Sequence, residues 1–364
     1  MRTTNYKQRT TTPYQQTTNN QQPTIPNSML LRIDHETRLT YSAPVTESVI
    51  ETRTAPLSQD DQTVLGYKLR VTPPSPVTGY RDGFGNRVEL FNLLTPYTEI
   101  AIRAAACVRV QRPIATEQLR EVPWLPELGR QVEAMEFLRS SPQVDFARLV
   151  REFADAVPLS DCTTLLEVAE AIMRAVRMQL RYEKKVTAAH TRVSESLALG
   201  LGVCQDFTHL YLAAARLRGL PARYVSGYIH QPGELATHAW VQLWAGSTVG
   251  WVNLDPTHGK WVESEHVVTA VGRDFSDVPP NRGVWKGDAT ETIAVTVNVQ
   301  PVDRVPADLA EPTDSPGWSG QEGGQGTGRG SQSQNQQARN RAFRQQQSQQ
   351  QQTESRSNTG SHTP

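Results

Sequence analysis

Cysteine is scarce in this chain of 364 residues: only Cys107, Cys162 and Cys204 are present, far apart and without a C-x-x-C pair. Three cysteines cannot form a complete set of disulfides, so we expect free thiols and a reducing, cytoplasmic compartment. Neither charge is in excess, because Lys plus Arg and Asp plus Glu both total 37. A balanced chain gives no sign of nucleic acid or of an anionic membrane surface as its partner.

Long apolar runs are also missing. No stretch approaches the length that spans a bilayer, so we expect no membrane span. The opening residues, MRTTNYKQRTTTPYQQTTNNQQPT, contain no apolar core of a secretory signal. Aliphatic residues are scarce at both ends, in a Thr/Gln/Asn-rich segment at 1–28 and a Gln/Gly/Ser-rich segment at 303–364. Such segments bury too little apolar surface to offset the entropy of ordering, so we expect both tails to be disordered.

Residues 29–112 alternate apolar and polar side chains over short segments such as MLLRIDHETRLTYSAPV, TVLGYKLRVTP and EIAIRAAACVRV. This period of two predicts β-strands, and RDGFGNR at 81–87 supplies glycine-containing turn residues for a hairpin. We therefore expect an N-terminal antiparallel β-sandwich. Its lone His35 and Cys107 belong to no cluster of reactive side chains, and we interpret both as structural residues.

The next residues, 113–160, are expected to form a helical connecting region. PWLPELGRQVEAMEFLRSS and DFARLVREFADAV carry apolar residues at the three- and four-residue spacing of a helix. The pattern resumes in TTLLEVAEAIMRAVRMQLRY at 163–182, for which Thr163 or Asp161 is the candidate N-cap. Cys162 falls at this cap, and we interpret it as inert.

The third cysteine, Cys204, opens the helical pattern CQDFTHLYLAAARLR, which ends before Gly219 and Pro221. At a helix N-terminus a thiol faces unpaired backbone N–H groups and the positive end of the helix dipole, which favour the thiolate. The preceding Gly200 and Gly202 let a backbone or a substrate approach closely. This position predicts a nucleophile, and another residue must supply its base.

His209 is the nearest histidine in sequence, but five residues along a helix turn by about 140°. Its side chain is therefore predicted to point away from Cys204, which also disfavours a metal site formed by this pair. Gln205, His209 and Arg216 are predicted to form a polar face opposite the apolar stripe. Neither a metal nor another cofactor is expected.

A better partner lies in ATHAWVQLWAGSTVGWVNLDPTHG, which predicts two strands joined by a tight loop. If residues 246–249 form that loop, Trp240 pairs with Asp255. His238 and Asp255 then lie on one face as diagonal neighbours, within side-chain reach of each other. A loop one residue longer or shorter would put them on opposite faces.

Cys204, His238 and Asp255 thus supply a nucleophile, a base and a residue that orients the base, in this chain order. Such a set attacks a carbonyl carbon, forms an acyl-thioester and releases it to water or to an amine. The backbone N–H of Cys204 is the first candidate oxyanion donor, and Gln205 and Tyr182 are candidates for the second.

Four blocks, GVCQDFTHLYLAAARLRGLPARYVSGY, THAWVQLW, GWVNLDPTHG and AVGRDFSDVPPNRGVWKG, together resemble the bacterial transglutaminase-like family. IDHETRLTYSAPV, RTAPLSQDDQTV and DGFGN similarly resemble the β-rich N-terminal domain that accompanies this core. The resemblance implies an α+β fold in which the β-sandwich of residues 29–112 precedes a papain-like catalytic domain at 161–302. It also implies Cys204 as nucleophile, His238 as base and Asp255 as its partner.

The chain departs from the family pattern at Thr208, where alanine is expected, and at His258, which follows DPT where asparagine is commoner. Neither is a triad position, although His258 is close enough to influence substrate selection. The segment GRDFSDVPPNRGVW at 272–285 either walls the cleft through its Arg and Asp side chains or packs over the sheet before a last strand, ETIAVTVNV. We favour the packing role.

Hydrolysis of an amide or peptide bond is the first functional hypothesis, with a peptide or protein amide as substrate. Transfer of the acyl group to an amine, as in protein cross-linking, is the alternative, and a deep water-excluding tunnel would favour it. A non-catalytic peptide-binding module fits less well because all three triad residues are present. A metal or redox protein also fits less well, because Cys204 has no second cysteine nearby.

Overall fold

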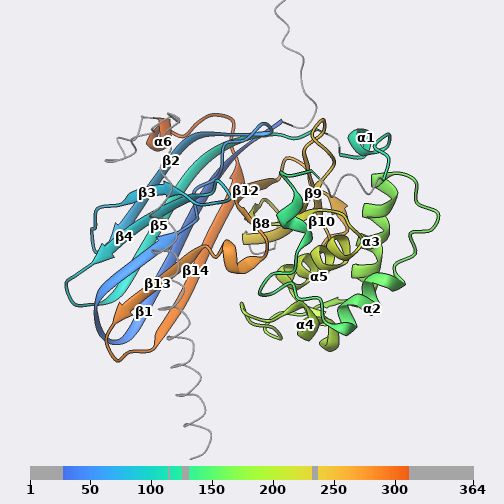
Figure 1. The fold of residues 1–364 in the computed structure, drawn as a ribbon. Helices are drawn as coiled ribbons and strands as arrows, with labels where there is room; N and C mark the ends of the chain where they lie inside the picture. Colours follow the sequence, from blue (N-terminus) through green and yellow to red (C-terminus); the bar gives the residue numbers. More distant parts are fainter. Residues whose placement is uncertain (1–27, 114, 125–130, 232–236, 311–364) are drawn as a thin grey trace, which may run out of the picture. The chain divides into compact units, whose positions relative to one another are not determined.

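The computed structural model describes residues 28–113, 115–124, 131–231 and 237–310. Figure 1 shows a strand-rich part, and a second part in which helices lie against another sheet. This is the α+β fold expected from the sequence. Within the described ranges, no helix is long and apolar enough to cross a membrane.

The strand-rich part is built around β1 (Ser28–Thr52), a long strand whose two halves take different antiparallel partners. The other strands of this part are β2 (Gln62–Thr72), β3 (Thr78–Arg81), β4 (Arg87–Leu93), β5 (Tyr97–Gln111), β13 (Asn281–Lys286) and β14 (Glu291–Pro301). The first half of β1 lies between β5 and β14, with β2 beyond β5. The second half lies between β4 and β13, with β3 beyond β4.

Alternation along β1 explains how these layers pack. Every second side chain from Leu31 to Tyr41 is buried. Leu39 from the first half and Ile50 from the second half enter the same apolar core, together with Phe91 of β4 and Ile100 of β5. The two layers therefore share one core, as in the expected sandwich.

Two strands of this part come from an unexpected stretch of the chain. The family resemblance implies a catalytic domain at residues 161–302, but β13 and β14 pair with β1 along Thr46–Thr52 and Leu31–Tyr41. Alternation identifies a strand without showing which sheet it joins. Here β5 covers only one edge of the first half of β1, and β14 pairs with the other edge.

Part of the segment 303–364, which was expected to be disordered, is ordered after β14. Residues Ala307–Ala310 form the helical turn α6, whose Leu309 is buried over β2. A Cβ atom on Gly66 would come within 2.3 Å of the Leu309 carbonyl oxygen, so the turn sits directly on that glycine. One leucine in a polar stretch carries no periodicity that could have predicted this contact. Ser28 belongs to β1, and residues 1–27 and 311–364 of the expected tails lie outside the described residues.

The second part is an antiparallel sheet in the order β11-β10-β9-β8-β12 with helices beside it. Its strands are β8 (Ala222–Ile229), β9 (Thr237–Trp244), β10 (Trp251–Asp255), β11 (Lys260–Trp261) and β12 (His266–Gly272), and β6 (Arg181–Tyr182) and β7 (Leu201–Gly202) form a separate parallel pair. Its helical segments are α1 (Ala115–Leu119), η2 (Met135–Leu138), α2 (Arg148–Ala156), α3 (Leu165–Gln179), α4 (Val193–Leu199), α5 (Cys204–Leu217) and η3 (Phe275–Asp277). Helix α5 lies at the centre, against α2, α3, α4, β8 and β9.

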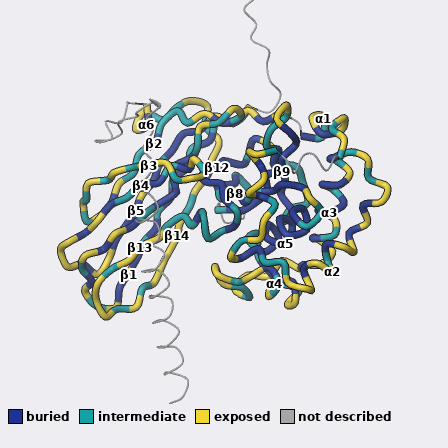
Figure 2. The backbone as a smooth tube through the Cα atoms, in the orientation of Figure 1, coloured by how far each residue is buried: buried dark blue, intermediate teal, exposed yellow. Residues whose placement is uncertain are grey.

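The polar residues predicted to lie opposite the apolar stripe of α5 are largely buried. Figure 2 colours most of this helix as buried, and His209 and Arg216 are only 0% and 3% exposed. The guanidinium of Arg216 donates to the carbonyl oxygens of Ala222 (3.0 Å) and Arg139 (3.2 Å). Backbone carbonyls can thus satisfy a polar helical side chain inside a protein, which a helical wheel does not reveal.

The connecting region is less helical than expected. Of the helix expected in PWLPELGRQVEAMEFLRSS, the described residues contain only the short turn η2. Prolines at 123, 126 and 142 bracket this segment and limit a longer helix. Helix α2 does form, within the DFARLVREFADAV pattern.

Side chains of the strand-rich part form hydrogen bonds with the outer edge of β12, the edge strand of the five-stranded sheet. The side-chain amide of Gln62 accepts from Val268 N–H (2.8 Å) and donates to its carbonyl oxygen (2.9 Å). Asn86 forms the same pair of hydrogen bonds with Val271, at 2.8 Å each. Val268 and Val271 are three residues apart, and a bulge between Val268 and Ala270 lets both backbone units face outward. Two amides thus replace a neighbouring strand.

Candidate active site

Cys204 occupies the first position of α5, after an extended Val203. Two glycines, Gly200 and Gly202, shape the backbone that leads into α5. Gly200 ends α4 at φ 68°, a left-handed conformation that glycine adopts without strain. Gly202 lies so close to Asp206 that a Cβ atom would be 2.5 Å from the Cβ of that residue. The group that comes close to Gly202 is therefore the side chain of Asp206, which belongs to the helix that begins at Cys204.

Asp206 holds the start of α5 in place. Its Oδ2 accepts hydrogen bonds from Val203 N–H (2.8 Å) and from the Thr187 hydroxyl (2.7 Å). Burial raises the pKa of this carboxyl group and outweighs the lowering effect of those hydrogen bonds. A carboxylate in the first helical turn pairs with N–H groups that have no partner within the helix. Cys204 thus sits on a fixed helix terminus.

The register of β9 and β10 is the one predicted from the loop at 246–249. Trp251 pairs with Trp244 and Leu254 pairs with Val241, and this register places Asp255 opposite Trp240. His238 is then the diagonal neighbour of Asp255, and its Nε2 lies 2.8 Å from Asp255 Oδ2. The parity argument from the sequence is confirmed.

The electrostatics of His238 show how its two neighbours act on it. Burial lowers its pKa, but hydrogen bonds with Asp255 and Cys204 and the charges of both groups raise it to about 10. Since Nε2 faces Asp255, the contact with Cys204 falls to the other ring nitrogen, Nδ1. The ring therefore bridges the thiol and the carboxylate, and it is stabilised in its protonated form.

Asp255 is the centre of a group of three histidines. Its Oδ2 lies 2.8 Å from His238 Nε2, 2.5 Å from His258 Nδ1 and 3.5 Å from His266 Nε2. Its Oδ1 accepts from Thr257 N–H (2.9 Å). Burial raises the pKa of Asp255, but the three imidazoles outweigh burial and hold it well below the usual value. The carboxylate stays ionised although it is buried.

His258 and His266 reach Asp255 by different routes. His258 belongs to the DPTH block, which predicts a position near the site but does not predict its contact with Asp255. His266 was missed because it begins β12, which pairs with β8 and not with β10. No motif spacing links the two, so only the sheet order β10-β9-β8-β12 could have placed His266 near Asp255.

A polar ladder fixes the strands behind His238. Asn253 Oδ1 accepts from Trp240 Nε1 (2.9 Å) and from Gln242 Nε2 (3.0 Å). Gln242 Oε1 accepts in turn from Arg223 Nε (2.7 Å). The Trp240 ring stacks beside His238, with 6.2 Å between ring centroids. These contacts hold the face of β9 and β10 that carries His238 in a single arrangement.

Other candidates from the sequence take structural positions. His209 is fully buried, its Nε2 accepts from Phe275 N–H (3.3 Å), and burial lowers its pKa to about 4. Its Nε2 is thus occupied by the backbone of η3, in keeping with a structural position. Gln205 donates to the carbonyl oxygen of Ala189 (3.2 Å), so its amide serves the neighbouring loop. Tyr182 lies in β6 with its ring 6.4 Å from that of Phe207.

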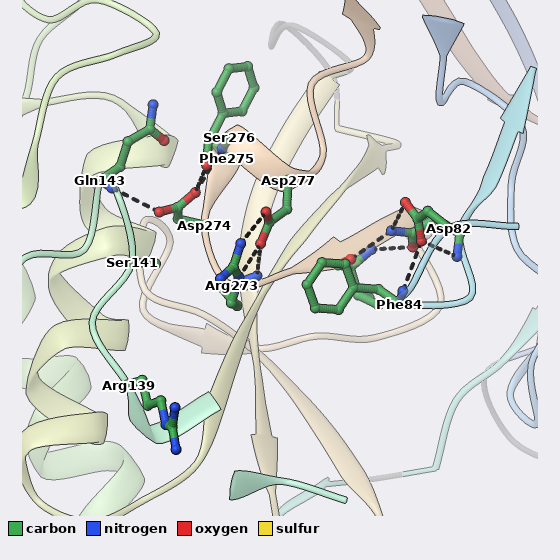
Figure 3. A network of polar contacts seen from close by, with 12 residues as sticks. Asp82, Phe84, Arg139, Ser141, Gln143, Arg273, Asp274, Phe275, Ser276 and Asp277 are labelled. Atoms are coloured by element: carbon green, nitrogen blue, oxygen red, sulfur yellow. Dashed lines mark hydrogen bonds and ion pairs between the residues drawn. The ribbon is translucent and has the colours of Figure 1, made fainter. Parts of the chain in front are cut away.

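The segment at 272–285 forms a polar network with the connecting region (Figure 3). Arg273 Nε pairs with Asp277 Oδ2 at 2.9 Å. Asp274 points the other way, and its Oδ2 accepts from Gln143 N–H (2.8 Å) while its Oδ1 accepts from Ser276 N–H (2.8 Å). The contacts of Asp274 with Gln143 and Ser276 agree with the packing role.

The arrangement as a whole places a thiol, an imidazole and a carboxylate in series. The N–H groups of Cys204 and Gln205 belong to the first turn of α5, where no preceding carbonyl of the helix is available to them. They are the donors best placed for an oxyanion formed at Cys204. A carbonyl carbon above the thiol could thus be attacked and its oxygen stabilised.

Two family models match the chain in keeping with this geometry. The transglutaminase-like superfamily matches residues 151–256, and the bacterial transglutaminase-like N-terminal region matches residues 31–109. The first range contains Cys204, His238 and Asp255, and the second falls within β1 to β5. The chain belongs to the transglutaminase-like superfamily, and it carries the N-terminal region of the bacterial members.

Similar proteins cover most of the chain. An uncharacterised protein of Mycobacterium tuberculosis strain H37Rv, Rv2569c, is 32% identical over 294 residues, which are 75% of this chain and 93% of the relative. Protein ML0607 of Mycobacterium leprae, also uncharacterised, is 29% identical over 279 residues, or 74% of this chain and 98% of the relative. Among solved structures, a candidate cysteine protease from Cytophaga hutchinsonii has a TM-score of 0.66 at 22% identity, covering 77% of this chain and 92% of that one. This last similarity shows the shared fold.

Proposed function

We propose that the protein is a cysteine-dependent amide or peptide-bond hydrolase that uses Cys204, His238 and Asp255 as its catalytic triad. The observation that carries the proposal is the position of His238, which interacts with Cys204 on one side and lies 2.8 Å from Asp255 on the other. Superfamily membership and the cysteine-protease-like fold support the same class of chemistry.

Acylation begins when the Cys204 proton passes to His238, whose ring Asp255 holds in orientation. The thiolate sulfur attacks the carbonyl carbon of the amide, and the first-turn N–H groups of α5 stabilise the negative oxygen. His238 then gives its proton to the leaving nitrogen. The C–N bond breaks, an amine departs and an acyl-thioester remains on Cys204.

Deacylation reverses these proton movements. His238 takes a proton from water, the oxygen attacks the thioester carbon, and the C–S bond breaks. Cys204 recovers its proton from the imidazolium, and the product leaves as a carboxylic acid. An amine in place of the water would give a new amide, which is the transglutaminase reaction.

The test is a reaction of the full chain with a mixed peptide pool in heavy-oxygen water, read by mass spectrometry. Hydrolysis places heavy oxygen in newly formed carboxyl groups, whereas acyl transfer to added methylamine gives a methylamide. We expect heavy-oxygen carboxyl groups to exceed methylamides with the native chain. Neither product should form with Cys204→Ala or His238→Ala. Full turnover by Cys204→Ala would contradict the mechanism, and a dominant methylamide would favour transfer.

A further inference from the structure

His266 is a buried histidine that the proposed reaction does not use. It is fully buried at the start of β12, its Nε2 lies 3.5 Å from Asp255 Oδ2, and its Nδ1 lies 3.5 Å from Glu265 Oε1. A neutral imidazole carries one ring proton and can offer it to only one of these two carboxylates. The other carboxylate then faces a nitrogen lone pair, an unfavourable contact that a cation between them would relieve.

The atoms around that contact have the composition of a metal site. His238 Nε2, Asp255 Oδ2 and His266 Nε2 lie within 4.8 Å of one another, and all three residues are buried. A tetrahedral zinc ion with bonds of about 2.0–2.2 Å holds its nitrogen and oxygen ligands roughly 3.4 Å apart. The 3.5 Å between His266 and Asp255 already matches, and the 2.8 Å between His238 and Asp255 must widen by roughly half an ångström. Small side-chain rotations suffice.

The outer contacts of His266 also suit a metal ligand. Histidines that bind metals commonly donate their second ring N–H to a carboxylate, which leaves the other nitrogen free to coordinate. Glu265 Oε1 is the carboxylate oxygen nearest to this role, 3.5 Å from Nδ1 but not hydrogen-bonded to it, and Lys260 Nζ anchors the same oxygen at 2.6 Å. With its proton on Nδ1, His266 presents the lone pair of Nε2 toward Asp255 and His238.

Metal binding at this point would act directly on the base. A ring coordinated through Nε2 keeps its remaining proton on Nδ1, the nitrogen that faces Cys204. His238 could not then accept the thiol proton. Two imidazoles and a carboxylate are a donor set that zinc takes in preference to harder ions such as magnesium.

We propose that His238, Asp255 and His266 form a zinc site through which the metal inhibits the Cys204 thiol. The inhibitory part rests on the proposed function, whereas the site itself does not. Zinc binding and catalysis are mutually exclusive in this arrangement, because both require Nε2 of His238 and Oδ2 of Asp255.

Binding is tested first, without reference to activity. The full chain is stripped of metal with EDTA, and zinc is titrated in competition with a chromophoric chelator. We expect one zinc per chain for the native protein, with the same affinity in Cys204→Ala. His266→Gln should weaken binding at least 100-fold, whereas His190→Gln, which changes an exposed histidine away from the site, should alter it less than threefold. Loss of binding in Cys204→Ala, or its retention in His266→Gln, would overturn the site.

A second variant, Glu265→Gln, tests the site even if His266→Gln does not fold. It leaves the three ligands in place and removes only the carboxylate beside Nδ1, so we expect binding to weaken by about 10- to 100-fold. Unchanged binding in Glu265→Gln, with a cooperative thermal transition retained, would contradict the arrangement of His266 described above.

Inhibition is measured as the rate at which iodoacetamide alkylates Cys204, followed by mass spectrometry. Saturating zinc should slow alkylation of the native chain at least tenfold, and EDTA should restore it. The rate in His266→Gln should not respond to zinc. Tight zinc binding with an unchanged alkylation rate would overturn the inhibitory role alone. If no amide substrate is turned over but zinc still binds as expected, the proposed hydrolase function fails and the site stands.

Discussion

At the scale of single residues, Asp255 shows how a buried carboxylate is kept ionised. Three imidazoles surround one of its oxygens and backbone N–H groups bind the other. A buried charge without such partners would instead take up a proton. The proposed base therefore depends on Asp255 for its ring orientation and for the stability of its protonated form.

Replacing Asp255 by Asn preserves the size of the side chain and removes its charge. We expect kcat/KM for an amide substrate to fall by about 10²–10⁴-fold, because His238 loses its orienting acceptor and its imidazolium loses a counter-charge. The loss should be smaller than that of Cys204→Ala, which removes the reacting atom. Steady-state kinetics provide the measurement, and Asp288→Asn at an exposed turn is the matched control. Unchanged kinetics in Asp255→Asn would remove Asp255 from the triad.

Gly202 offers a second test at this scale. A Cβ atom here would lie 2.5 Å from Asp206 Cβ and 2.7 Å from its Oδ2, so the start of α5 must move. We expect Gly202→Ala to lower the free energy of unfolding by about 1–3 kcal/mol and to reduce the alkylation rate of Cys204. Gly83→Ala, where nothing lies within 4 Å of the added atom, should change neither quantity. Equal stability of the two variants in urea would show that α5 tolerates the shift.

At the scale of elements, the sequence predicts the local geometry of the site well. Cys204 starts a helix because glycines precede it and an apolar stripe follows, and both signals lie within one element. The contact of His238 with Asp255 depends on the length of one tight loop, which fixes the register of two adjacent strands. Each inference needs only neighbours in the chain, and the structure agrees with each.

The parts that the sequence could not predict involve elements that are distant in the chain. Strand β14 carries the alternation of ETIAVTVNV, and β13 lies in the segment 272–285, where no strand was predicted, but only the free edges of β1 decide where the two strands pair. His266 approaches Asp255 because β12 lies beside β8, an order that no periodicity encodes. His209 and Arg216 are polar yet buried, since loops and other helices also surround α5 on the side opposite its apolar stripe.

The edge of β12 yields a prediction about an element. Gln62 is 1% exposed, and its amide is the hydrogen-bond partner of Val268 N–H. Gln62→Leu would leave that buried N–H without a partner, so we expect the free energy of unfolding to fall by about 1–3 kcal/mol. Urea denaturation monitors the change, and Gln300→Leu, at an exposed position of β14, is the control. A loss no greater than that of Gln300→Leu would mean that the edge is satisfied in another way.

At the scale of the whole molecule, the part that contains Cys204, His238 and Asp255 is inserted between strands of the strand-rich part. The chain leaves the strand-rich part after β5 and returns to β1 through β13 and β14. One apolar core also joins the two parts, since Tyr228 and Val267 of the five-stranded sheet pack with Leu31 and Tyr67. The two parts should therefore fold together.

This coupling predicts one cooperative unfolding transition. Alkylation of Cys107, which is buried in β5, should follow the same urea dependence as the fluorescence of the tryptophans in β9 and β10. A chain ending at residue 280 lacks both returning strands and should lose that transition, whereas a chain ending at residue 310 should keep it. Separate transitions for Cys107 and for tryptophan would show that the parts fold independently.

The stability of the whole molecule should also depend on pH through His35. This residue joins the two parts, with Nδ1 2.8 Å from the Tyr228 hydroxyl, and burial lowers its pKa to about 4. The unfolded chain, with a histidine pKa of about 6.5, binds more protons between these values, so stability falls as pH decreases from about 6.5 to 4. From pH 7 to pH 5 this amounts to about 2 kcal/mol for His35, and His209 acts in the same direction.

His35→Gln tests this dependence because it removes the titrating group from the join between the two parts. The variant should be less stable than the native chain at pH 7, yet it should lose about 2 kcal/mol less on going to pH 5. His190→Gln, at an exposed position, should leave the native slope unchanged. Urea denaturation at both pH values measures the two slopes. An equal slope in His35→Gln would mean that His35 does not remain neutral in the folded protein, and the acid sensitivity would then have to come from other groups.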